Sequence, residues 1–172
     1  MATIVQTEEE RAVELEKVDA MLEGKGARPF DVMEALQDIQ EEFRYLPEAA
    51  MCRVSEALEV PLIEVFRLAN FYKAFSLKPR GRHLITVCEG TACHVQGSPR
   101  VVEEVLAQLD VERGETTQDG AFTVETVNCV GACALAPVVI IDGKYYDHMT
   151  AGKLRDLLKT VRQQDEEVAS HA

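Results

Sequence analysis

The sequence predicts a small helical bundle over residues 1–80, followed by an α/β domain over residues 81–163 and a polar tail at 164–172. Three observations support this prediction. Hydrophobic residues recur at helical spacing throughout the first 80 residues. Proline, glycine and basic residues interrupt that pattern in the segment SLKPRGRH, residues 76–83. Beyond this segment, short apolar runs typical of strands alternate with helical segments.

Composition and charge place the chain among ordinary globular proteins. It has 172 residues, 47% hydrophobic and 28% charged, with a formal net charge of −12. An acidic chain repels phosphate backbones, which argues against a nucleic-acid partner. No apolar run approaches the roughly 20 residues that a membrane helix needs, and the N-terminus lacks the basic and apolar regions of a secretory signal. We therefore expect a cytoplasmic protein without a membrane span, whose thiols are reduced or bound to metal.

Four helices are expected in the first 80 residues. Thr7 and Glu10 have capping-box spacing at the start of the first helix, and Gly24 stands where that helix would end. Pro47 and Pro61 are typical of first-turn prolines that open the third and fourth helices. The apolar positions that define the four helical faces are Leu15, Val18 and Leu22; Val32, Leu36, Ile39 and Phe43; Met51, Val54 and Leu58; and Leu62, Val65, Phe66 and Ala69.

The second half alternates strands and helices. Strands are predicted at residues 84–87, 122–127, 138–141 and 144–146, and helices at 98–109 and 150–161. Ser98 with Pro99 opens the first of these helices, and Thr150 caps the second. Asp142 and Gly143 form a tight hairpin turn between the last two strands. The tail QQDEEVASHA is polar and is expected to be frayed. The β-α-β-β-β-α order is that of a thioredoxin-like domain.

Four of the five cysteines form two close pairs, Cys88 with Cys93 and Cys129 with Cys133. Each pair directly follows a predicted strand. Two strands joined through one helix form a right-handed crossover between parallel strands, so their carboxyl ends lie at the same edge of the sheet. We therefore expect the two pairs to meet in space, although 35 residues separate them. Four converging thiols in a reducing compartment indicate a metal site.

The spacing of the cysteines is compatible with two kinds of metal site. Structural zinc sites usually have two to four residues between neighbouring ligands, and both C-x4-C and C-x3-C fall in that range. A [2Fe–2S] cluster takes two thiolates per iron, which suits two separate loops. Spacing favours iron–sulfur but leaves zinc, and loops without metal, open. A thioredoxin-type redox pair is disfavoured because no C-x-x-C motif occurs.

Residues beside the cysteines support an iron–sulfur site. Gly90, Gly97 and Gly131 let the backbone bring N–H groups toward sulfur without a Cβ clash. Glu89 adds negative charge next to Cys88, which would lower the reduction potential of a nearby cluster. An ordinary solvated carboxylate is an equally simple interpretation of Glu89.

The remaining candidates are interpreted as structural. Cys52 lies on the apolar face of the third predicted helix and is expected to be a small buried residue. His94 follows Cys93, but four cysteines suffice for a metal, so we expect His94 to face a partner or solvent. Pro137 starts a strand, where proline is tolerated. The one basic cluster is interpreted as a linker or as a docking patch for an acidic partner; it comprises Lys73, Lys78, Arg80 and Arg82.

The segments VCEGTACHVQGS and NCVGACALAPVVIIDGKYY resemble the thioredoxin-like [2Fe–2S] ferredoxin subunit of NADH-oxidising complexes. That family includes the small peripheral subunit of respiratory complex I and the matching subunits of NAD(P)-linked hydrogenases, electron-bifurcating hydrogenases and NAD-dependent formate dehydrogenases. The segments LQDIQEEFRYLPEAA and VPLIEVFRLANFYKAFSLKPRGRH are similar to the family's helical domain, so the resemblance covers about residues 30–160. It implies that Cys88, Cys93, Cys129 and Cys133 ligate one [2Fe–2S] cluster.

The resemblance also implies a non-catalytic carrier of single electrons within a multi-subunit NAD(P)H-linked oxidoreductase. FMN and NAD(P) are then expected on a flavin- and NAD(P)H-binding partner, with further iron–sulfur, hydrogenase or dehydrogenase subunits in the same complex. The sequence agrees, since it contains neither G-x-G-x-x-G nor G-x-x-x-x-G-K-[ST]. Two alternatives stay open, a zinc-stabilised thioredoxin-like interaction module without a redox role and a free-standing ferredoxin.

Overall fold

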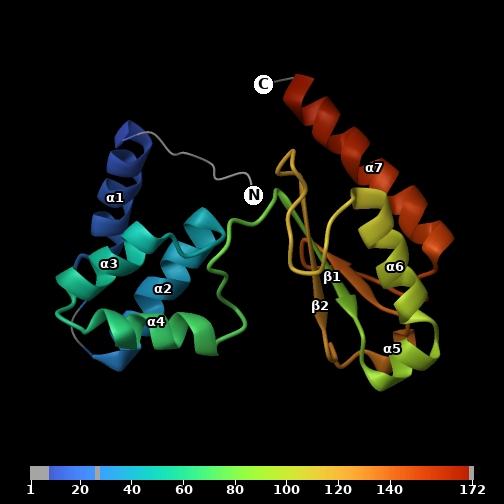
Figure 1. Cartoon of the computed structure of the whole chain (residues 1–172), viewed down its shortest axis with the longest axis horizontal. Helices are drawn as coiled ribbons and strands as arrows, with labels where there is room; N and C mark the ends of the chain where they lie inside the picture. Colours follow the sequence, from blue (N-terminus) through green and yellow to red (C-terminus); the bar gives the residue numbers. More distant parts are fainter. Residues whose placement is uncertain (1–7, 26–27, 171–172) are drawn as a thin grey trace. The chain divides into compact units, whose positions relative to one another are not determined.

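The computed structural model describes residues 8–25 and 28–170, and the chain divides into two compact units between Arg80 and Gly81 (Figure 1). The expected capping pair at the start of the first helix lies outside the described residues, since it needs Thr7 and the Glu10 side chain. Among the helices that the structure describes, none is long and apolar enough to cross a lipid bilayer.

The first unit consists of four helices, α1 (Glu8–Leu22), α2 (Pro29–Phe43), α3 (Glu48–Ala57) and α4 (Leu62–Phe71). Most of the predicted apolar positions meet in one core, which includes Val18, Leu36, Ile39, Val54 and Val65. The prediction is wrong for Leu62 and Phe66 of α4, which are both 45% exposed. Gly24, with a φ of +77°, allows the turn after α1. Pro47 and Pro61 stand one residue before α3 and α4, at the N-cap rather than in the first turn.

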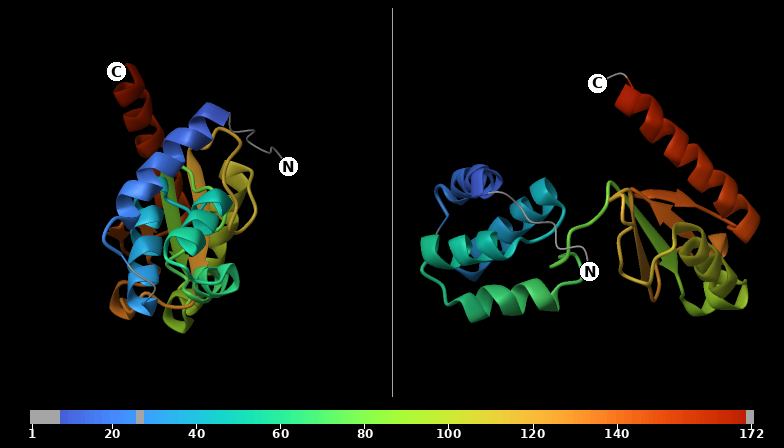
Figure 2. Two further views of the ribbon diagram at one scale, coloured as in Figure 1. Left: turned by 90° about the vertical axis from the view of Figure 1, so that its left-hand side faces the viewer. Right: turned by 45° about the horizontal axis from the view of Figure 1, so that its top comes forward.

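The second unit is a four-stranded mixed sheet with the order β2-β1-β3-β4 (Figures 1 and 2). Its strands are β1 (His83–Cys88), β2 (Phe122–Val127), β3 (Val139–Ile141) and β4 (Lys144–Tyr146). Strands β1 and β2 are parallel, which confirms the predicted crossover, and β3 is antiparallel to both β1 and β4. The turn from β3 to β4 has positive φ at Asp142 (+50°) and Gly143 (+80°), as predicted for a tight hairpin.

Two helices, α6 (Ser98–Leu109) and α7 (Ala151–Ser170), pack together against one face of this sheet. The face is apolar because alternate strand residues, including Ile85, Val87 and Val124, are fully buried. Two short elements that the sequence did not predict lie on the cysteine loops, namely helix α5 (Thr91–Val95) and the 3₁₀ turn η1 (Cys133–Leu135).

The prediction of a frayed tail from residue 163 is wrong, because α7 continues to Ser170. The apolar stripe that marks the helix in the sequence ends at Val161, which is buried. The following glutamine, glutamate and alanine residues are good helix formers, and extending an existing helix needs no new nucleus. The apolar stripe in the sequence therefore underestimates the length of α7.

A polar network holds the start of β1 to the hairpin and to α7. The His83 Nδ1 atom lies 2.6 Å from Asp142 Oδ2, and its Nε2 atom lies 2.8 Å from Asp165 Oδ1. Arg82, a member of the predicted basic cluster, donates a 3.1 Å hydrogen bond to the same Asp165 carboxylate. Burial by itself would lower the pKa of His83, but its hydrogen bonds to the carboxylates of Asp142 and Asp165 outweigh burial and raise that pKa. The fold therefore favours the protonated form of His83.

This network predicts a pH-dependent stability of the second unit. Because the folded pKa of His83 is raised above its unfolded value, its stabilisation is complete below the unfolded pKa, about 6.5, and is lost as pH rises through the folded pKa. We expect His83→Gln to remove on the order of 1 kcal/mol at pH 6 and much less at pH 9. Urea unfolding followed by far-UV circular dichroism across this range measures the difference. His148→Gln, at an exposed histidine, serves as the control; an equal loss at both pH values for His83→Gln would contradict the prediction.

Candidate metal centre

The first cysteine pair is buried at the carboxyl end of β1. Cys88 is the last residue of that strand and Cys93 lies in α5, and each is 2% exposed. The backbone of Cys88 is fixed from two sides, since its N–H donates to the Val138 carbonyl (3.1 Å) and its own carbonyl accepts the Ser98 hydroxyl. Ser98 is the first residue of α6, as predicted, and its buried hydroxyl also fixes the end of the strand that carries Cys88.

The second cysteine pair follows β2 and is exposed. Cys129 lies in the loop and Cys133 begins η1. Gly131, at a φ of +83°, turns its N–H toward the Cys129 Sγ atom at 3.3 Å. The predicted N–H to sulfur contact is confirmed for Gly131. It is wrong for Gly97, whose N–H donates to the His94 carbonyl (3.1 Å).

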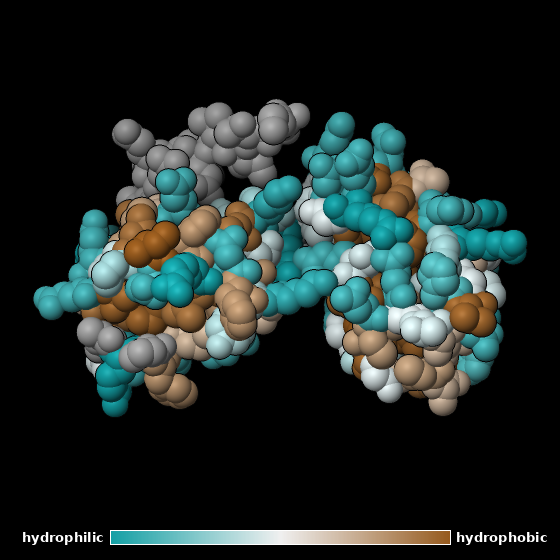
Figure 3. Space-filling view, turned by 60° about the horizontal axis from the view of Figure 1, so that its bottom comes forward, coloured by the Kyte–Doolittle hydropathy of each residue, from teal (hydrophilic) through white to brown (hydrophobic). Residues whose placement is uncertain are grey.

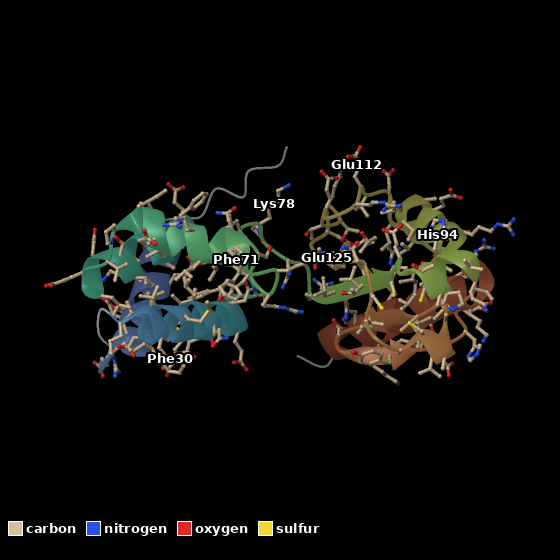
Figure 4. The ribbon with its side chains drawn as sticks, turned by 90° about the horizontal axis from the view of Figure 1, so that it is seen from below. Phe30, Phe71, Lys78, His94, Glu112 and Glu125 are labelled. Atoms are coloured by element: carbon tan, nitrogen blue, oxygen red, sulfur yellow. The ribbon has the colours of Figure 1, made fainter. Side chains whose placement is uncertain are left out.

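The two cysteine loops are packed directly against each other at Gly90. A Cβ atom at this residue would lie 2.5 Å from the Asn128 carbonyl oxygen and 3.2 Å from the Cys129 Cβ atom. The Cys88 thiol lies within hydrogen-bonding reach of both Cys93 and Cys129. The charge of Cys88 also contributes to raising the pKa of Cys133. Figure 4 shows sulfur atoms gathered in the second unit, beside the helix that carries His94. The predicted convergence of the two pairs is confirmed.

The pKa values of Cys88, Cys93 and Cys133 are shifted in different directions. Burial would raise the pKa of Cys88, but the N–H groups of Gly90 and Val130 and the neighbouring thiols lower it. Burial raises the pKa of Cys93, and the neighbouring Cys129 raises that of Cys133. The site therefore favours a thiolate at Cys88 over one at Cys93 or Cys133. A bound metal would take the place of thiol protons, because only thiolates act as ligands.

The buried cysteine pair has apolar surroundings. Cys88 and Cys93 belong to a small apolar cluster with Ala136 and Val138, which keeps water from that side. Among residues 8–25 and 28–170, no three cysteine, histidine or carboxylate side chains surround one ion-sized point. A [2Fe–2S] cluster does not need such a triplet, since each iron takes only two protein thiolates.

The other residues singled out in the sequence are exposed, half-buried or paired with another side chain. His94 is exposed on α5 (Figure 4). Cys52 is half-buried rather than buried, and it lines a groove on the helical unit.

Glu89 is not a simple solvated carboxylate, because the Arg113 guanidinium pairs with it at 2.7 Å. Arg113 was missed from sequence because it lies 24 positions away in a loop with no motif. The peptide bond before Pro137 is cis.

Comparison with known proteins places this site in a family. The family model described as thioredoxin-like [2Fe-2S] ferredoxin matches residues 18–162. The HndA subunit of the NADP-reducing hydrogenase of Solidesulfovibrio fructosivorans is 41% identical over 123 residues, 72% of this chain and 72% of the relative. An NADH-quinone oxidoreductase subunit of Rhizobium meliloti (strain 1021) is 35% identical over 147 residues, 86% of this chain and 88% of the relative.

A solved structure with the same fold is the NAD⁺-reducing [NiFe]-hydrogenase in the air-oxidized state. It superposes with a TM-score of 0.65 at 23% sequence identity, over 75% of this chain and 23% of that chain. This chain therefore spans about a quarter of that hydrogenase chain, and the likeness is one of fold. The thioredoxin-like character of the fold agrees with the family model. The match over residues 18–162, the two relatives and the paired cysteine loops agree: the chain belongs to the thioredoxin-like [2Fe-2S] ferredoxin family, whose members bind a [2Fe–2S] cluster.

Proposed function

We propose that this chain holds a single [2Fe–2S] cluster and carries one electron at a time within a multi-subunit, NAD(P)H-linked oxidoreductase of the cytoplasm. The observation that supports the ligand set most strongly is the packing of Gly90 against the Cys129 loop, which joins two cysteine pairs far apart in the sequence. The proposed ligands are Cys88, Cys93, Cys129 and Cys133.

The cluster, when bound, supplies a reversible one-electron step. The protein residues around it have distinct tasks. Cys88 and Cys93 hold it on the buried side, where Ala136 and Val138 exclude water. Cys129 and Cys133 are exposed, so electrons would enter and leave on their side. Backbone N–H groups directed at sulfur, such as that of Gly131, stabilise thiolate charge and favour the reduced state.

The partner that we propose is a flavin- and NAD(P)H-binding subunit, with further iron–sulfur, hydrogenase or dehydrogenase subunits beyond it. The relatives named above are subunits of an NADP-reducing hydrogenase and of an NADH-quinone oxidoreductase. Hydride carries two electrons, and a flavin is needed to release them singly to a cluster. The cluster chain and the flavin chain therefore divide one reaction between them.

The helical unit offers a surface on which such a partner can dock. A groove of about 500 Å³ opens between α3, α4 and the segment after α4. Ile63 on its lining is 62% exposed and Phe66 is 45% exposed, and Figure 3 shows hydrophobic residues at the surface of this unit. The groove is lined by Leu46, Glu48, Met51, Cys52, Leu62, Ile63, Phe66 and Leu77. Large exposed apolar patches mark interaction sites, so we assign docking to this unit.

Anaerobic reduction tests the proposed function. The purified chain alone should accept one electron from dithionite, with the EPR signal of a reduced [2Fe–2S] centre, and should not bleach with NADH. Adding the flavin-carrying subunit should allow NADH or NADPH to bleach it. Phe66→Glu should keep the dithionite reaction and weaken the partner-dependent one. Rapid bleaching by NADH without flavoprotein would contradict the division of labour, and a colourless chain that contains zinc would contradict the cluster.

A further inference from the structure

Glu89 is the single charged residue inside the two cysteine loops, CEGTAC and CVGAC. Its backbone is fixed on both sides. Its N–H donates to the Val127 carbonyl at the end of β2 (2.8 Å), and the neighbouring Gly90 is wedged against the Cys129 loop. The side chain is 22% exposed, so the carboxylate is partly withdrawn from water. Glu89 therefore places a negative charge, on a fixed backbone, at the residue next to Cys88.

Arg113 holds this carboxylate from the loop between α6 and β2. Its Nη1 atom donates to Glu89 Oε2 at 2.7 Å. The loop is itself tied down, since the N–H of Gly114 donates to the Val124 carbonyl in β2 at 2.7 Å. The ion pair is thus anchored to β1 and to β2, the two strands whose ends carry the cysteines.

Charge at this position affects electron uptake directly. A cluster held by four thiolates is anionic, and reduction adds a further negative charge. A nearby carboxylate makes that addition less favourable by Coulomb repulsion, and a guanidinium on the carboxylate offsets the repulsion. Solvent and salt screen part of the effect, because the pair is only partly buried. Arg113 therefore acts in the direction that eases reduction.

We propose that Arg113 is a positioning residue that holds and neutralises Glu89, and thereby keeps the reduction potential of the cluster from falling. The assignment rests on the proposed function, since it needs a cluster on the four cysteines. It concerns a residue outside both cysteine loops and outside the ligand set. Substitution of both residues provides an internal check. Removing both charges leaves the net charge near the cluster unchanged, so the reduction potential should return toward its wild-type value.

The test is a mediated redox titration of the full chain loaded with its cluster, followed by EPR and visible absorbance. For Arg113→Gln we expect reduction to become about threefold less favourable, which is about 30 mV toward lower potential at 59 mV per tenfold for a one-electron couple. Glu89→Gln should shift the potential in the opposite direction, and the double variant should lie close to the wild type. The shift for Arg113→Gln should shrink at high salt.

The chain offers a matched control in the Arg155–Glu104 pair of α7 and α6. It has a distance of 2.8 Å and the same side-chain exposures, 53% and 22%, but lies outside the cysteine loops. An Arg113→Gln potential at or above the wild type, or an equal shift in Arg155→Gln, would overturn the assignment. Iron content separates the two proposals. If the chain binds its cluster but the Arg113 and Glu89 variants have the wild-type reduction potential, this inference alone is overturned. If the wild-type chain binds no iron, the proposed function and this inference are both overturned.

Discussion

Cys129→Ala leaves the chain with little or no iron and acid-labile sulfide. The same loss is expected for alanine at Cys88, Cys93 or Cys133. Each iron of a [2Fe–2S] cluster takes two protein thiolates, so three remaining cysteines cannot complete both. The variants should be nearly colourless after reconstitution, and iron and sulfide per chain give the measurement. Far-UV circular dichroism establishes that each variant still has folded helices.

Cys52→Ala is the matched control for these variants. Cys52 lies in α3 of the helical unit, while all four proposed ligands lie after Gly81. We therefore expect full cluster content in Cys52→Ala. A fully loaded Cys129→Ala protein, or a folded Cys52→Ala protein without iron, would show that the ligand set is wrong.

Gly90→Ala should weaken cluster retention on the order of tenfold or more without removing any ligand. The added Cβ would lie 2.5 Å from the Asn128 carbonyl oxygen and 3.2 Å from the Cys129 Cβ atom, so the two cysteine loops must separate. Overpacking of this kind costs about 1–3 kcal/mol, and 1.4 kcal/mol corresponds to tenfold. Alanine keeps the N–H group that lowers the pKa of Cys88, so the substitution isolates the steric effect. The rate of iron transfer to a chelator measures retention.

Gly152→Ala provides the control for this steric effect. Gly152 lies in α7, where a Cβ would have no neighbour within 4 Å, and its φ is not positive. We expect Gly152→Ala to release iron at the wild-type rate. Equal release rates in Gly90→Ala and the wild type would contradict the role of Gly90 as the contact between the loops.

The sequence predicted the features of this site that depend on short-range patterns. Strand, helix and strand in succession required a parallel crossover, and the crossover brought Cys88 and Cys129 to one edge of the sheet. The Asp142–Gly143 turn followed from the backbone preferences of these two residues. These features could be predicted because each depends on a few neighbouring residues.

Other features depend on tertiary contacts and leave no local signal. Arg113 reaches Glu89 only because a loop folds back along β2. Ser98 stands where a helix cap is common, yet its hydroxyl bonds to the Cys88 carbonyl because α6 begins against the end of β1. Helix α5 is five residues long, too short for a periodic pattern. Such contacts become visible only when the chain is folded.

Because of the parallel crossover, a cluster on the four proposed cysteine ligands would cross-link distant parts of the chain. Cys93 and Cys129 enclose 35 residues, including all of α6. A metal centre that closes a loop of this size would lower the conformational entropy of the unfolded chain. In the chain-entropy treatment of a covalent cross-link, this stabilises the folded state by roughly 3–4 kcal/mol. Occupancy of the site and resistance of the second unit to unfolding are therefore thermodynamically linked. Conditions that strip the centre also loosen the sheet whose edge carries it.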